Sequence, residues 1–123
     1  MSLQRFALSI ALLVALLFFS PGCRRAASEQ WEIVVENKSG AACTVLIDMD
    51  AGSNHSNARV DDLPDGKHLS LIVGDRDTVI SLVRVTRGGV EQRVEPNLPL
   101  TVGKRCDVVV GPDGKATLSL SSR

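Results

Sequence analysis

The chain has 123 residues, with 14 basic and 14 acidic side chains and no formal net charge at neutral pH. Three phenylalanines and one tryptophan are its only aromatic residues, and the phenylalanines all lie within the first 19 positions. A nucleic-acid partner would require a cationic stripe, ideally with stacking aromatic side chains, and the sequence has neither. Composition therefore excludes the nucleic-acid-binding class, and the length suits one domain.

An apolar run from Phe6 to Phe19 follows Arg5 and is interrupted only by Ser9. As a helix it would span about 21 Å, which is short of the ~20 residues needed to cross a bilayer. A short apolar run behind a positive charge is typical of a signal peptide. We therefore expect a hydrophobic signal helix and export, with residues 1–22 as the signal peptide.

The sequence Ser20-Pro21-Gly22-Cys23 resembles the lipobox of bacterial lipoproteins, in which a small residue precedes a cysteine. The resemblance implies that Cys23 is acylated and anchors the protein to a membrane, as a periplasmic or cell-surface lipoprotein. It departs from the usual pattern, because Ser20 and Pro21 replace the common leucine and the common alanine or serine. Two alternatives stay open: cleavage after Ala26-Ala27-Ser28, which would give a soluble secreted protein, and an uncleaved anchor.

Residues 23–31 are expected to form a tether, followed by one domain over residues 32–123. From Trp31 onward apolar residues recur with a period of two, and turn residues recur at intervals of roughly 8–12 positions, which is typical of a β-sandwich. The expected strands, in chain order, are Glu32–Glu36, Cys43–Met49, Ala58–Leu63, His68–Val73, Thr78–Arg87, Val90–Glu95, Arg105–Val110 and Ala116–Ser121, with Leu100–Val102 as an optional short addition.

These segments predict an all-β fold, an antiparallel β-sandwich of about seven or eight short strands. Strand number and turn spacing resemble immunoglobulin-like or fibronectin-like sandwiches, although no tryptophan lies between the two later cysteines and tyrosine is absent. Asp50–Asn57 is expected to be the longest polar loop. Pro96–Pro99 is expected to break the chain between strands, because proline cannot donate to a ladder.

Several apolar residues fall on the nominal outer faces of the predicted strands. One interpretation is that these strands are central and covered by loops, and the other is an exposed apolar patch that binds a partner. The residues are Val34, Leu46, Ile72, Ile80, Leu82 and Val109.

Cys43 and Cys106 are the cysteines that follow the leader. Cys43 lies on the same side of its strand as Val45, and Cys106 lies on the same side of its strand as Val108, so both thiols should face the core. An even pair of cysteines in an oxidising compartment predicts a disulfide. The alternative is two separate buried thiols.

The segment around Asp48 and Asp50 has the density of oxygen ligands that calcium requires, and Asp75 and Asp77 could join it. Its spacing does not fit an EF-hand loop, and surface turns use the same residue types. His55 is expected to be solvated. We therefore predict no metal or other cofactor and keep these four aspartates as weak candidates.

Gly88-Gly89 is expected to close a two-residue hairpin, which would place Arg84 opposite Arg93. Like charges across a ladder repel each other, and Glu91 and Glu95, lying diagonally, could relieve them. We interpret this face of the hairpin either as a solvated charged surface or as a docking surface for an anionic partner or lipid head group.

The sequence has no G-x-S-x-G elbow, no C-x-x-C pair and no phosphate-binding loop. It favours a non-catalytic binding or structural module at the cell envelope, with a protein or glycan partner. The alternative is an envelope hydrolase or metal-dependent enzyme, which requires Asp48, Asp50, His55, Asp75 and Asp77 to converge. A third hypothesis is a subunit that pairs through an exposed strand edge, for which Thr78–Arg87 is the longest candidate.

Overall fold

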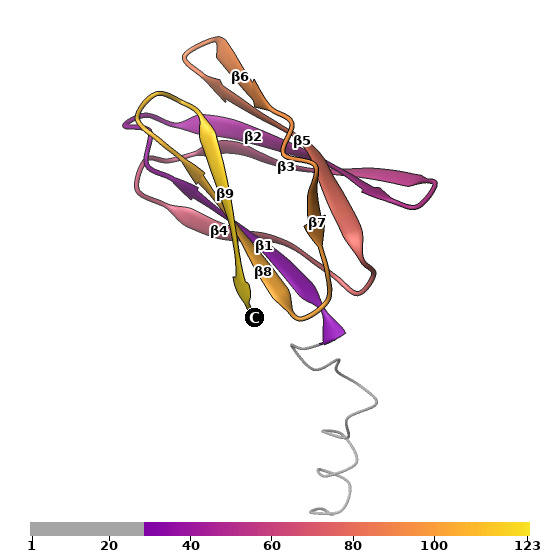
Figure 1. Cartoon of the computed structure of the whole chain (residues 1–123). Helices are drawn as coiled ribbons and strands as arrows, with labels where there is room; N and C mark the ends of the chain where they lie inside the picture. The colour runs from indigo at the N-terminus through magenta and orange to yellow at the C-terminus, as the bar shows by residue number, and fades with distance from the viewer. Residues whose placement is uncertain (1–28) are drawn as a thin grey trace, which may run out of the picture.

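The computed structural model describes residues 29–123, so the expected signal helix and Cys23 lie outside the described residues. Within them, no helix is long and apolar enough to cross a membrane. Strands make up most of this part of the chain (Figure 1). They are β1 (Trp31–Asn37), β2 (Cys43–Ala51), β3 (Asn54–Leu63), β4 (His68–Gly74), β5 (Thr78–Arg87), β6 (Val90–Val94), β7 (Leu98–Leu100), β8 (Lys104–Val110) and β9 (Ala116–Ser122).

The strands form two sheets, which confirms the predicted all-β sandwich. Sheet A has the order β4-β1-β8-β9, and sheet B has the order β3-β2-β5-β6 with β7 also paired to β5. Two details of the prediction are wrong: the described residues form nine strands, and β1 pairs with β8 in parallel. The parallel pair arises because β6 and β7 are both antiparallel to β5 and so run in the same direction. The chain therefore reverses direction one time fewer between β1 and β8, and these two strands start at the same end of the sandwich.

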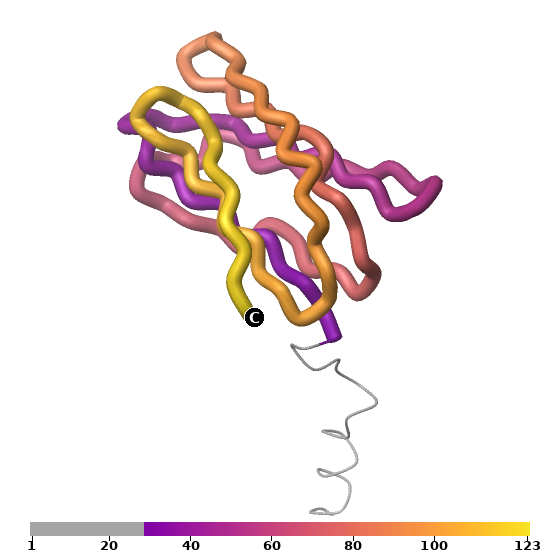
Figure 2. Tube along the Cα trace, in the orientation of Figure 1, coloured from indigo at the N-terminus to yellow at the C-terminus, as the bar shows by residue number. Residues whose placement is uncertain are grey.

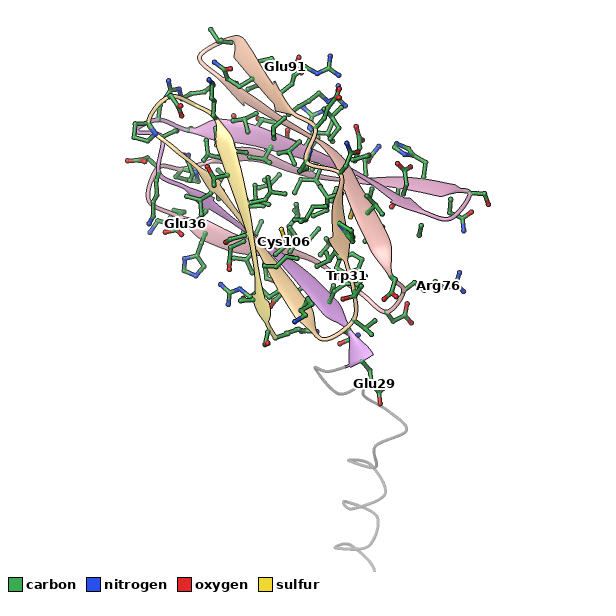
Figure 3. All side chains as sticks on the ribbon, in the orientation of Figure 1. Glu29, Trp31, Glu36, Arg76, Glu91 and Cys106 are labelled. Atoms are coloured by element: carbon green, nitrogen blue, oxygen red, sulfur yellow. The ribbon has the colours of Figure 1, made fainter. Side chains whose placement is uncertain are left out.

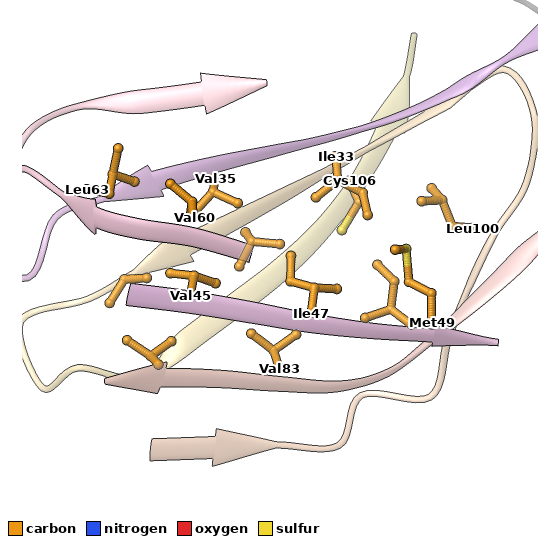
Figure 4. Close-up of a cluster of buried hydrophobic side chains, with 14 of the residues drawn as sticks. Ile33, Val35, Val45, Ile47, Met49, Val60, Leu63, Val83, Leu100 and Cys106 are labelled. Atoms are coloured by element: carbon orange, nitrogen blue, oxygen red, sulfur yellow. The ribbon is translucent and has the colours of Figure 1, made fainter. Parts of the chain in front are cut away.

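The core lies between the sheets and is built from the alternating apolar positions (Figure 4). On β2, Cys43, Val45, Ile47 and Met49 are buried while the residues between them are half-buried. Strand β8 has the same alternation, with Cys106, Val108 and Val110 buried. Period-two alternation in a half-buried strand therefore predicted the inward faces correctly.

The predicted polar loop Asp50–Asn57 is instead part of a hairpin. The β2–β3 ladder continues outward to the pair Ala51 and Asn54, and only Gly52 and Ser53 form the turn. Gly52 has φ +62°, which glycine adopts at little cost in such a turn. Figure 2 shows this hairpin extending from the sandwich as an arm.

Trp31 and Gly74 close the end of the sandwich at which the described chain begins. They are partners in the β1–β4 ladder, and the indole Nε1 donates to the carbonyl of Arg76. A Cβ on Gly74 would lie 2.2 Å from the Trp31 ring atom Cζ2, so only glycine leaves room for the indole. Sheet edges use glycine where a large side chain packs over the backbone.

Asn37 connects the other end of β1 to two turns. Its side-chain Nδ2 donates to the carbonyls of Ala41 and Leu63 at 2.7 and 2.8 Å, and its Oδ1 accepts from the amide of Ser39. Its backbone N–H donates to the carbonyl of Lys67. The side chain is fully buried, so these bonds satisfy a polar group that burial would otherwise make costly.

The predicted disulfide is wrong: Cys43 and Cys106 are free thiols, both buried. Cys43 pairs with Leu63, whose carbonyl is bonded to Asn37, and Asn37 pairs with Val110 of β8. Cys106 lies four positions earlier on β8, about 13 Å along the strand. Bridged cysteines need Cα atoms within about 7 Å, so both thiols face the core but lie at different levels of it.

Replacing Asn37 with alanine should destabilise the fold by about 2–4 kcal/mol, because the carbonyls of Ala41 and Leu63 and the amide of Ser39 lose their partner. Urea unfolding of the wild type and the variant measures the difference. Asn57→Ala, at an exposed position of β3, is the matched control and should change stability by less than about 0.5 kcal/mol. Equal effects of the two substitutions would contradict the role given to Asn37.

The folded protein should keep Cys43 and Cys106 as unreactive thiols. Burial, with a contribution from the Asp107 carboxylate, raises the pKa of Cys106 to about 11, and burial also raises the pKa of Cys43. A thiolate-directed reagent should therefore label them only in denaturant. Intact mass should be the same before and after reduction; a gain of two hydrogens on reduction would show that the pair is oxidised.

Candidate functional site

The outer face of sheet B collects most of the polar residues that the sequence singled out. On β2, the outward positions are Thr44, Leu46, Asp48 and Asp50, each half-buried between neighbouring strands. Strand β2 is central, with β3 on one side and β5 on the other. Side chains from these strands and β6 can therefore meet on one surface.

An irregularity in β5 changes which residues reach this surface. The β2–β5 register shifts between Asp48, which pairs with Leu82, and Met49, which pairs with Ile80, so Ser81 is an extra residue. Ser81 and Leu82 are half-buried, and the Ser81 Oγ donates to the carbonyl of Asp48 at 3.2 Å. Ile80 is fully buried, which corrects the expectation that it lies on an outer face.

Asp48, Asp50 and His55 come together toward the Gly52-Ser53 turn of the β2–β3 hairpin. The ladder pairs Asp50 with His55, and the His55 Nδ1 lies 2.7 Å from the Asp50 Oδ1. The His55 Nε2 lies 3.7 Å from the Asp48 Oδ1. The hydrogen bond to Asp50 is the main cause that raises the pKa of His55, and the same bond lowers the pKa of Asp50.

Arg84 occupies the centre of the face. As predicted, it lies directly opposite Arg93 across a hairpin closed by Gly88 and Gly89, which have φ +57° and +77°. The Arg84 Nη2 is 3.7 Å from the Asp48 Oδ2, so an aspartate of the neighbouring strand offsets the like charges. The Arg84 Nε is buried and has no hydrogen-bond partner among the described residues.

A groove of about 130 Å³ lies beside Arg84 on the outer face of sheet B, and we call it the sheet B groove. Four strands contribute to it, which gives it two guanidinium groups, two hydroxyls, a carboxylate and an apolar side chain. One guanidinium, that of Arg59, also contacts the Asp61 carboxylate at 2.7 Å. The groove is lined by Thr44, Leu46, Arg59, Arg84, Thr86 and Glu91.

The remaining candidate residues lie elsewhere. Asp75 and Asp77 are in the turn between β4 and β5, and the Asp77 Oδ1 accepts a hydrogen bond from the amide of Val102. Glu95 directly follows the last residue of β6. The described part of the chain has no group of three or more histidine, cysteine or acidic side chains placed to hold a metal ion. Of the five residues that the enzyme hypothesis requires to converge, only Asp48, Asp50 and His55 lie together.

Sequence reasoning did not name Thr44, Arg59 or Thr86 as candidate site residues, and it named Leu46 only as an apolar residue of an outer face. The alternation along Cys43–Met49 predicted that Thr44 and Leu46 point away from the core. It could not show that β3 and β6 bring Arg59 and Glu91 to the same surface, because that depends on strand order.

The chain matches no known protein family, and no curated protein matches it in sequence.

The pair His55–Asp50 predicts a measurable pH dependence. NMR titration should give His55 a pKa above the ordinary value of about 6.5, and Asp50→Asn should lower it. Because the pKa of His55 is higher in the folded than in the unfolded protein, the pair stabilises the fold fully at pH values below the unfolded-state pKa of this histidine. The stabilisation is lost as the pH rises through the pKa of His55 in the folded protein. Asp50 has a lowered pKa, so its contribution is lost as pH falls through that value. The control Asp61→Asn removes a carboxylate that contacts Arg59 instead, and an equal shift of His55 in that variant would contradict the assignment.

Proposed function

We propose that this protein is an exported, lipid-anchored, non-catalytic binding module that recognises an acidic glycan at the cell envelope through the sheet B groove. Export and anchoring through Cys23 rest on the leader sequence. The glycan class rests on the groove.

The observation that carries the proposal is the buried Arg84 Nε, which has no partner among the described residues. A buried donor without an acceptor is unfavourable, and native structures satisfy nearly all such groups. Arg84 lines the sheet B groove and its side chain is 33% exposed, so a ligand can reach the exposed part of the guanidinium. The covered Nε becomes available to the same ligand when the guanidinium turns toward the groove. A carboxylate is the acceptor that a guanidinium binds best, through charge-assisted hydrogen bonds.

The other lining residues favour an acidic sugar over a bare inorganic anion. The Glu91 carboxylate would repel a small anion but can accept hydrogen bonds from sugar hydroxyls. The hydroxyls of Thr44 and Thr86 can both donate and accept. Leu46 adds apolar surface that suits the C–H face of a sugar ring. A volume of about 130 Å³ suits a single sugar carboxylate with part of its ring.

The groove is well placed for an anchored protein. The described chain begins at the end of the sandwich where Trp31 packs on Gly74. Thr44 and Thr86, which pair with each other, lie toward the opposite end, near the Gly88-Gly89 turn. Figure 3 shows Glu91 at the end of the molecule remote from Trp31 and Glu29. A tether that joins at Glu29 would therefore leave the groove facing away from the membrane.

Calorimetric titration with oligogalacturonate tests the proposal. The exported protein should bind this acidic oligosaccharide and should not bind a neutral galactan oligomer of equal length. Arg84→Gln should weaken binding about tenfold or more, because it removes a charge-assisted hydrogen bond.

Arg76→Gln is the matched control, since Arg76 lies in the exposed β4–β5 turn away from the groove. It should leave the affinity unchanged, and thermal unfolding should show that both variants are folded. Equal binding of the neutral oligomer, no binding of either, or equal effects of the two arginine substitutions would each overturn the proposal.

A further inference from the structure

The edges of the two sheets differ in chemistry. On sheet B, the edge strand β3 carries Arg59, Asp61 and Asp62, the edge strand β6 carries Glu91 and Arg93, and β7 contains Pro99. Charged residues and proline are the devices by which proteins prevent an edge strand from pairing with another chain. The hypothesis that Thr78–Arg87 offers an exposed edge is wrong, because β5 is flanked by β2 on one side and by β6 and β7 on the other.

Sheet A ends in β4 and β9, and only β9 has an unprotected edge. Strand β4 contains His68, and its ladder with β1 shifts register between Ile33 and Val34. Such a bulge twists an edge and interrupts its pattern of donors and acceptors. Strand β9 has the sequence ATLSLSS, without charge or proline, and pairs with β8 over seven consecutive residue pairs without a shift.

The inner face of β9 is also incompletely covered. Leu120 pairs with the buried Cys106, which places it on the inward face, yet it is 43% exposed. Leu118, on the same face, is half-buried. Sheet B approaches β9 at its start, where Val94 and Ala116 line a shared groove of about 180 Å³.

We propose that β9 pairs antiparallel with β9 of a second copy of this chain, which joins the two A sheets into one continuous sheet. The strand is self-complementary: serine and threonine alternate with leucine and alanine. With a two-fold axis through Ser119, Leu118 of one copy lies opposite Leu120 of the other, and the serines meet on the outer face. Such an isologous contact uses the same surface on both copies.

The charge balance of the chain allows this association. Its basic and acidic residues are equal in number, so no net charge repels a second copy. Directly paired aliphatic side chains stabilise a ladder, and the unsatisfied edge N–H and C=O groups of β9 would gain partners. Leu120 and the accessible part of Leu118 would lose solvent contact.

Analytical ultracentrifugation of the exported chain carrying Cys23→Ser, which removes the proposed acylation site, tests the pairing in aqueous buffer. The protein should form dimers with a dissociation constant below about 100 μM, as expected for a small interface. Ser119→Lys should raise that constant at least tenfold, since it places like charges together at the axis.

Ser56→Lys makes the same change on the already charged edge strand β3 and should leave the dimer intact. Thermal unfolding should show that both lysine variants are folded, as their exposed positions allow. A monomer at all concentrations up to about 1 mM overturns the proposal and would point to a strand from another protein. A dimer that Ser119→Lys does not weaken, or that Ser56→Lys weakens equally, also overturns it.

Discussion

The buried amide of Asn37 is the constraint on which the distal half of the sandwich depends. It ties the end of β1 to the β1–β2 turn and to the end of β3. At the same end, the Arg87 Nη1 donates to the carbonyls of Ser39 and Pro112, which joins the β1–β2 turn to the β8–β9 turn. A domain of this size has a modest core, so polar bonds that link non-adjacent segments matter to it. They also hold in place β2 and the β5–β6 hairpin, which carry Thr44 and Thr86 of the sheet B groove.

The period of two explains both the success and the failure of the sequence-based predictions for the fold. A strand places alternate residues on one face, so the inward phases of β2 and β8 followed from the sequence, as did the pairing of Arg84 with Arg93. The same rule does not tell how far along the sandwich a residue of one strand lies relative to a residue of another strand. Cys43 and Cys106 both point into the core, from opposite sheets, but lie at different levels of it, because the parallel pairing of β1 with β8 sets their offset. That pairing joins segments about 70 residues apart and leaves no local pattern.

The site was only partly predictable for a related reason. Asp50–Asn57 has the composition of a turn, yet β2 provides a ladder that holds all but Gly52 and Ser53 as strand. The extra residue at Ser81 moves Ile80 inward, and no feature of the sequence marks that position. The sequence suggested the charged hairpin as a docking surface, and two of its residues, Arg84 and Glu91, line the sheet B groove. Its neighbours Arg59 and Leu46 depend on the order β3-β2-β5-β6, which becomes known only from the structure.

The groove and the free edge belong to different sheets, and this separation has a mechanical consequence. The groove side chains project from paired strands, so a ligand meets a surface that is already ordered and pays little entropy for binding. Strand pairing at β9 extends sheet A in its own plane and leaves the outer face of sheet B uncovered. A dimer would therefore present two grooves on one rigid body. Two weak sites that engage the same polymer raise the effective concentration for the second contact, so under both proposals a modest affinity at each groove would suffice for stable attachment to a repetitive glycan.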